Sequence, residues 1–288
     1  MAQVEICAVC GNNPATGQGE HVWPQWFLKA MDALGPPKKP WAVNSIPVVN
    51  KRGVPIHHSQ RQRVLLPVCR TCNGELNKRF EMPAREVVKE LATNGWSGEF
   101  NQAEWHSVGM WWAKVLLMLG HPKARLGDRR LNDIAIRFDN PPHDYRWMVD
   151  GSSPPVDLSL WVFRGAIEDS ESEFTMVLPD SVAMRSGSTA LCHELSLVTE
   201  GLCVTVVSHP GVSIDHPLVN RQDAWELLHN PPQRGDLSKL RSLPGKAVSW
   251  MRGEKVPEGH SVGPDQFSRL TAMIGYESDD VLPEPEGI

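Results

Sequence analysis

Two Cys-x-x-Cys pairs are the residues of this chain whose chemistry is clearest from type and spacing. Cys7 and Cys10 form the first pair, Cys69 and Cys72 form the second, and 58 residues separate them. Four thiolates in two such pairs can complete a tetrahedral zinc site. A closed four-sulfur shell leaves no position for substrate or water, so we expect a structural zinc ion that folds a small module.

A carboxylate, an imidazole and an amide accompany these cysteines. Glu20 and His21 open the segment Glu-His-Val-Trp-Pro between the two pairs, and Asn73 directly follows the last cysteine. Carboxylate and amide oxygens suit Mg²⁺ or Mn²⁺ better than zinc. An imidazole can deprotonate water near neutral pH. Held beside the zinc site, the three groups have the composition of a second, catalytic metal centre.

The order of these motifs resembles the HNH (ββα-metal) endonucleases that carry a four-cysteine zinc site. In that family an acidic residue or His followed by His lies on the first strand, commonly with Pro three residues later. The helix opens with Cys-x-x-Cys followed by Asn or His. The resemblance covers about the first 80 residues and does not extend to the rest of the chain.

The resemblance implies a role for each matching residue. His21 would be the general base, while Glu20 and Asn73 would bind the catalytic cation, Mg²⁺ or Mn²⁺. The implied reaction is hydrolysis of phosphodiester bonds, in DNA more than in RNA, leaving a 5′-phosphate and a 3′-hydroxyl. Asn77, one helical turn after Asn73, is a candidate third ligand because residues four apart share a helix face.

One position departs from the family pattern. The family usually carries an asparagine on the second strand that orients the catalytic loop, and here that position falls near Val64, next to Gln62 and Arg63. This departure supports the alternative hypothesis of a treble-clef module that binds nucleic acid or protein without cutting it.

Charge distribution is consistent with a phosphate-rich partner. Between Lys38 and Arg85 ten basic residues face only two acidic ones, a local charge of +8 that leaves −13 for the remainder of a chain with net charge −5. A basic segment beside the metal site can attract nucleic acid. The candidate contacts to phosphate are Arg61, Arg63, Arg70, Lys78 and Arg79.

The elements that must position the site are expected in an N-terminal zinc module, residues 1–82, with a treble-clef or ββα-metal fold. Hydrophobic patterning predicts strand, helix, strand and helix in turn: Glu20–Trp23, Gln25–Leu34, Arg63–Val68 and Cys69–Phe80.

The rest of the chain predicts an α+β protein. A helical segment, 83–138, should pack on the zinc module, with helices at Pro83–Ala92 and Asn101–Leu119. In the second helix Trp105, Trp111 and Trp112 are predicted to be core residues. A C-terminal region, 156–276, should form an antiparallel sheet with flanking helices, one near Arg221–Leu228. Residues 277–288 form an acidic tail expected to be disordered. The predicted strands are Leu158–Arg164, Phe174–Leu178, Leu191–Thr199 and Cys203–His209.

Composition suggests a cytoplasmic protein. The chain has no apolar run of membrane-spanning length and no signal-peptide pattern at its start, and its paired cysteines suit a reducing compartment. A third hypothesis is an interaction protein that binds a protein partner, or forms a homodimer, through the C-terminal region. The eleven tryptophans could mark such an interface.

Overall fold

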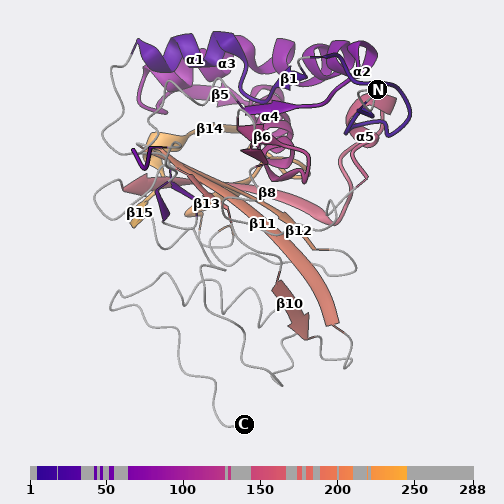
Figure 1. The fold of residues 1–288 in the computed structure, drawn as a ribbon. Helices are drawn as coiled ribbons and strands as arrows, with labels where there is room; N and C mark the ends of the chain where they lie inside the picture. The colour runs from indigo at the N-terminus through magenta and orange to yellow at the C-terminus, as the bar shows by residue number, and fades with distance from the viewer. Residues whose placement is uncertain are drawn as a thin grey trace.

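The protein combines a layer of helices with antiparallel sheets, which confirms the α+β class (Figure 1). The computed structural model describes residues 5–17, 19–33, 42–43, 46–47, 52–54, 64–126, 129–130, 144–166, 174–176, 180–183, 189–199, 201–209, 219 and 222–244. The tail at 277–288 and most of the segment between the predicted first helix and second strand lie outside these residues.

The N-terminal elements follow the predicted order. Strand β1 (Glu20–His21) pairs antiparallel with β4 (Val64–Leu66), and helix α1 (Gln25–Asp32) follows β1 directly. Helix α2 (Arg70–Leu76) begins after β4. Two short strands extend the sheet beyond β4, in the order β1-β4-β6-β7, namely β6 (Arg125–Leu126) and β7 (Arg129–Arg130).

The two helices predicted at Cys69–Phe80 and Pro83–Ala92 are joined. Helix α2 passes into a π-helical turn, η2 (Asn77–Glu81), and then into α3 (Met82–Thr93). Pro83 gives a physical reason for this turn. A proline has no N–H and its ring clashes with the carbonyl four residues earlier, so the preceding turn widens.

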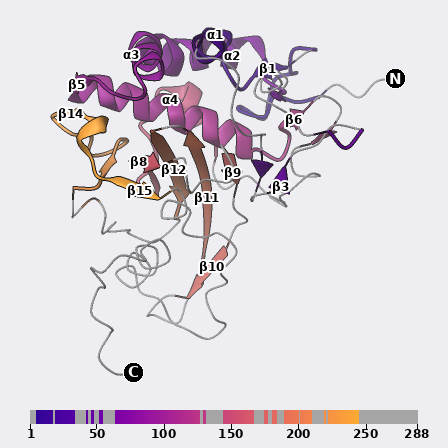
Figure 2. The same cartoon turned by 90° about the vertical axis from the view of Figure 1, so that its left-hand side faces the viewer.

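Helix α4 (Gln102–Gly120) lies between the helical layer and the sheet (Figure 2). A capping box formed by Asn101 and Glu104 fixes its start. The prediction that its tryptophans are core residues is confirmed, since Trp105, Trp111 and Trp112 are at most 1% exposed. Trp112 and Trp111 pack against Trp23 and Phe27 of the β1–α1 segment, and Trp105 packs against Trp225 of β13. One continuous hydrophobic core therefore joins the N-terminal module to the sheet.

The larger sheet has the strand order β10-β11-β12-β8-β13, with β9 on β11 and β15 on β8. All four predicted C-terminal strands are present. The bounds are β8 (Leu158–Ala166), β9 (Phe174–Met176), β10 (Asp180–Ala183), β11 (Thr189–Thr199), β12 (Leu202–Ser208), β13 (Ala224–Glu226) and β15 (Ser242–Pro244). The described residues also contain β2 (Ala42–Val43), β3 (Ile46–Pro47), β5 (Glu99–Asn101), β14 (Arg234–Asp236), α5 (Trp147–Asp150) and the 3-10 turn η5 (Leu237–Lys239).

The prediction of a helix near Arg221–Leu228 is wrong. This segment contains β13, which pairs antiparallel with β8, and a turn in which the Glu226 carboxylate accepts hydrogen bonds from the backbone N–H groups of Leu228, His229 and Asn230. A short apolar run fits a helical face and a strand edge equally well, so its period does not decide between them.

Across the described segments, no helix has both the length and the apolar character that crossing a membrane requires.

Candidate functional site

The four predicted zinc ligands come together. The sulfur atoms of Cys7, Cys10, Cys69 and Cys72 all lie within 4.8 Å of one another. Zinc–sulfur bonds of about 2.3 Å in a tetrahedron require sulfur separations of about 3.8 Å, so only a small contraction would complete the shell. The structure therefore brings together four cysteines that could bind one zinc ion.

Local backbone geometry forms each half of this cluster. Gly11 has a φ of +71°, and its N–H bonds the Cys7 carbonyl at 3.0 Å, which closes the first knuckle. Cys69 caps the N-terminus of α2, where its sulfur accepts the N–H of Cys72 at 3.5 Å. The N–H of Ala8 bonds the Pro67 carbonyl at 2.7 Å and so joins the two knuckles.

The electrostatics of the cluster favour a cation. Burial raises the pKa of the Cys72 thiol, and the neighbouring sulfurs raise it further. Burial also raises the pKa of Cys7. For Cys10 burial acts in the same direction, but hydrogen bonds from the backbone of Asn13 and Asn12 outweigh it and lower the pKa to about 7. Four adjacent thiolates repel one another unless a cation neutralises them, and a set of four soft sulfur ligands suits zinc.

The structure places Glu20 beside Asn73. Pairing of Glu20 with Leu66 in the β1–β4 ladder fixes the strand next to the start of α2, and the Asn73 side chain lies close enough to the Glu20 carboxylate to lower its pKa. Gly19 permits the close pairing of β1 with β4. Its φ is +73°, and a Cβ there would lie 2.8 Å from the Leu66 carbonyl oxygen.

Burial raises the pKa of the Glu20 carboxyl group, and charged neighbours modify that effect. Lys114 and His21 lower this pKa, whereas Glu81 raises it. His21 follows Glu20 on β1, pairs with Leu65 and is half-buried. Glu20 is therefore a partly buried carboxylate with an amide close to it and both signs of charge around it.

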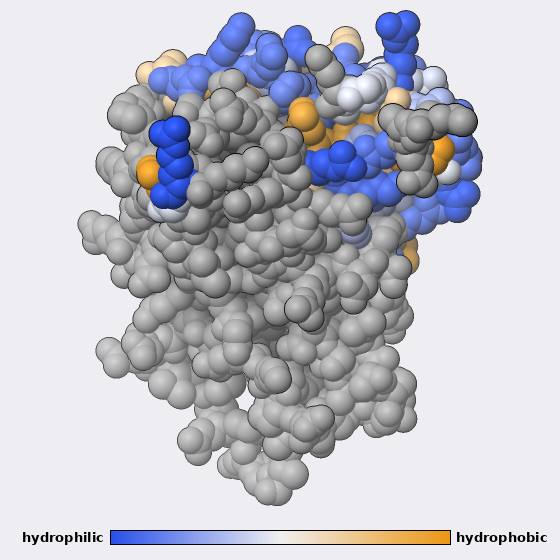
Figure 3. Space-filling view, viewed as in Figure 1, coloured by the Kyte–Doolittle hydropathy of each residue, from blue (hydrophilic) through white to orange (hydrophobic). Residues whose placement is uncertain are grey.

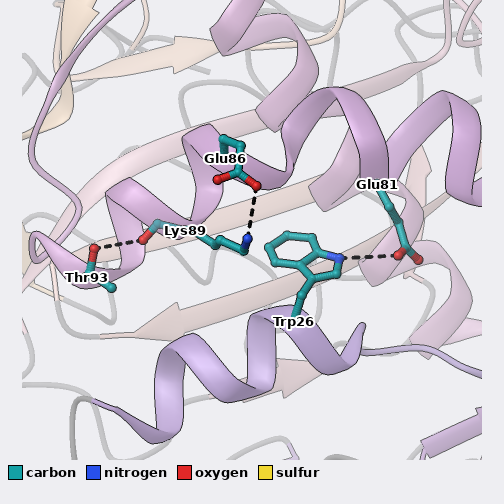
Figure 4. A network of polar contacts seen from close by, with 5 residues as sticks. All are labelled: Trp26, Glu81, Glu86, Lys89 and Thr93. Atoms are coloured by element: carbon teal, nitrogen blue, oxygen red, sulfur yellow. Dashed lines mark hydrogen bonds and ion pairs between the residues drawn. The ribbon is translucent and has the colours of Figure 1, made fainter.

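Two of these neighbours were missed by sequence reasoning. The Lys114 ammonium bonds Glu81 Oε1 at 2.7 Å. The Trp26 indole N–H donates to Glu81 Oε2 at 3.3 Å (Figure 4). Lys114 carried a usable signal, because it is the single charge in the apolar run from residue 108 to residue 120. A lysine in such a run is rarely buried without a partner. The sequence could not identify that partner, which lies 33 residues away.

The remaining predicted residues are placed as follows. Asn77 begins η2 and is half-buried, one turn after Asn73. Arg70 and Lys78 are exposed on α2 and η2. Arg61 and Arg63 lie outside the described residues.

Arg79 has contacts of a different kind. Its guanidinium donates to the carbonyls of Trp147 and Ser152 at 2.7 and 2.6 Å, which holds α5 against the zinc module. Val64, near which the resemblance predicts a strand asparagine, is fully buried. The Val64 carbonyl accepts the N–H of Val22 at 3.0 Å, so its backbone holds the residue that follows His21.

Comparisons with known proteins found no relative of this chain. No protein family, no curated protein and no solved structure matches this chain. The functional conclusion therefore depends on the residues and their geometry.

Proposed function

We propose that this chain is a metal-dependent endonuclease of the HNH (ββα-metal) type, which hydrolyses phosphodiester bonds of DNA in preference to RNA. Its N-terminal module would be a treble clef folded around structural zinc. One observation carries the proposal. The Asn73 side chain lies close enough to the Glu20 carboxylate to lower its pKa, Asn73 directly follows Cys72 of the four-cysteine cluster, and His21 follows Glu20 on β1.

The donor set fits a hard divalent cation. A hydrogen bond between the two groups would use the Asn73 amide N–H and one carboxylate oxygen, which would leave the other carboxylate oxygen and the amide oxygen for a cation. Mg²⁺ or Mn²⁺ bound there would stabilise the charge that develops on the phosphate. His21 would accept a proton from the attacking water as general base. Asn77 stays a candidate third ligand.

Contacts to the nucleic-acid backbone are proposed for the cations beside this site. Arg70 and Lys78 are exposed on the α2–η2 helix that carries Asn73. The described surface over the helical layer is predominantly hydrophilic (Figure 3). Such contacts release counterions, so binding should weaken steeply as salt rises.

A second function is favoured by one observation, the buried valine at position 64. Without the orienting asparagine, the module could bind nucleic acid or protein without cutting. Both proposals include a cytoplasmic location. Both also include contact with a protein partner, or with a second copy of the chain, through the C-terminal sheet.

Cleavage of supercoiled plasmid by the zinc-loaded chain tests the proposal. We expect nicking and linearisation with Mg²⁺ or Mn²⁺, 5′-phosphate ends, and no cutting in EDTA. Glu20→Ala should reduce cleavage to background because it removes the charged cation ligand. Glu86→Ala is the control, since Glu86 is an exposed carboxylate on α3. Salt-sensitive binding without cleavage in either metal would refute the nuclease and support the binding module.

A further inference from the structure

Arg85 on α3 is a half-buried cation that lies on an aromatic ring. Its guanidinium is over Trp26 of α1, with Cζ 5.9 Å from the ring centroid. Arg85 Nε is buried and makes no hydrogen bond, and no ion pair or hydrogen bond joins the side chain to any residue that the structure describes. A guanidinium keeps its charge in a protein, so an unpartnered one at this depth requires an explanation.

The other two arginines that the structure describes as half-buried use their guanidinium groups. Arg79 donates to two backbone carbonyls, and Arg125 pairs with Glu5. In Arg85 only Nε is a buried atom without a partner, so Nη1 and Nη2 reach the surface. Arg85 therefore offers open donors in a planar fork, which is the shape that binds a phosphate group.

The carboxylate best placed to neutralise Arg85 is already used. Glu81 lies four residues before Arg85, a spacing at which opposite charges on a helix pair. However, Glu81 Oε1 accepts a bond from Lys114 at 2.7 Å and Glu81 Oε2 accepts one from Trp26 at 3.3 Å. Glu81 thus holds the ring on which Arg85 lies without pairing with Arg85 itself.

The next charges along α3 also leave Arg85 uncompensated. Glu86, the following residue, bonds the Lys89 ammonium at 3.0 Å (Figure 4). Lys89 is four residues after Arg85 and carries the same sign of charge, which favours no pairing between them. The positive charge of Arg85 is therefore available to an anion from outside the chain.

The Arg85–Trp26 pair lies on the two elements that carry the candidate cation site. Helix α1 follows β1, which contains Glu20 and His21, and α3 continues the helix that begins beside Asn73. The Trp26 ring is fixed from behind by Trp111, whose centroid is 5.5 Å away.

The spacing along this helix suits one nucleic-acid ligand. Arg85 follows Asn73 by 12 residues, a rise of about 18 Å along the helix. Duplex DNA rises about 3.4 Å per base pair, so this length corresponds to about five base pairs.

We infer that Arg85, held on the Trp26 ring, is a further phosphate contact, which binds the nucleic-acid backbone several nucleotides from the bond that is cut. The inference rests on the proposed function and names a part of its substrate-binding surface. The ligand is the phosphodiester anion, since the open donors of Arg85 form a cationic fork and the ring beneath them is already occupied by the guanidinium.

Binding of a short fluorescent duplex to the zinc-loaded full chain, measured by anisotropy between about 50 and 200 mM salt without Mg²⁺ or Mn²⁺, tests the inference. Arg85→Met keeps an apolar side chain on Trp26 but removes the charge. It should lower the slope of log affinity against log salt by about 0.9, the value of one phosphate contact, and weaken binding about threefold or more. Arg85→Lys restores the charge and should return the slope to that of the parent.

Arg234→Met is the matched control. Arg234 lies on β14, and its guanidinium already pairs with Glu99 at 2.9 Å. Removing this charge should leave the salt slope and the duplex affinity unchanged.

Modification of the parent chain by an arginine-specific dicarbonyl reagent, followed by peptide mass spectrometry, tests the same contact without a substitution. Bound duplex should slow the modification of Arg85 and leave that of Arg234 unchanged. This measurement decides the outcome if Arg85→Met does not fold.

A purely structural role for Arg85 predicts different results. Arg85→Met would then melt at a lower temperature but keep the salt slope of the parent, and the duplex would not protect Arg85 from modification. Either the unchanged slope or the missing protection would overturn the inference. A parent that neither binds nor cuts DNA would overturn the proposed function, whereas a parent that does both independently of Arg85 overturns only this contact.

Discussion

Removal of zinc, by a chelator or by Cys72→Ser, is expected to unfold the N-terminal module. Binding of zinc to four thiolates contributes on the order of 10–16 kcal/mol at neutral pH, comparable with the whole stability of a typical domain. Cys7, Cys69 and Cys72 belong to the same buried core as Trp23 and Trp112, so losing the ion should also disturb α4. Metal analysis should give one zinc per chain, and circular dichroism should record the loss of structure.

Cys203→Ala is the matched control for this experiment. Cys203 is also a buried cysteine, but it lies on β12, outside the four-cysteine cluster. The variant should keep one zinc per chain while losing a small packing contribution, on the order of 1 kcal/mol. A Cys72→Ser chain that retained its zinc and its melting temperature would contradict the assignment of Cys72 as a ligand.

Replacing His21 by alanine is expected to lower the rate of plasmid cleavage by about 10²–10⁴-fold, the usual contribution of a general base. Zinc content and DNA binding should not change. The β1–β4 pairing uses the backbone of His21 and leaves its half-buried side chain out of the ladder. Single-turnover cleavage assays would measure the effect.

His106→Ala controls for the loss of an imidazole as such. His106 is half-buried on α4 and is assigned no part in the site. It should cleave at the parent rate. Equal cutting by His21→Ala and the parent would remove His21 from the mechanism, even if the cation site proved correct.

The parts of the site that the sequence predicted are those set by local spacing. Each Cys-x-x-Cys pair fixes its own turn, and pairing of β1 with β4, the next strand of the predicted module, brings Glu20 towards the start of α2. Asn73 follows from the same helix start. The helical spacing of apolar residues was likewise enough to predict α4, because the apolar residues of this segment are the ones that the helix buries.

The parts that the sequence did not predict depend on partners far along the chain. Pairing of Lys114 with Glu81 requires α4 to pack on η2, which no local pattern specifies. Arg79 was selected as a phosphate contact for its charge, whereas its donors meet carbonyls more than 60 residues away. At β13 a short apolar run was interpreted with the wrong period, because pairing with β8 decides its conformation.

A crystal of the zinc-loaded protein soaked in Mn²⁺, with anomalous diffraction recorded at the manganese and zinc edges, tests the central claim most directly. We expect a zinc peak enclosed by the four cysteine sulfurs and a separate manganese peak at the oxygens of Glu20 and Asn73, with His21 facing the same site. A manganese peak elsewhere, or none at Glu20 while the zinc site is full, would contradict the assignment of a catalytic cation to this position.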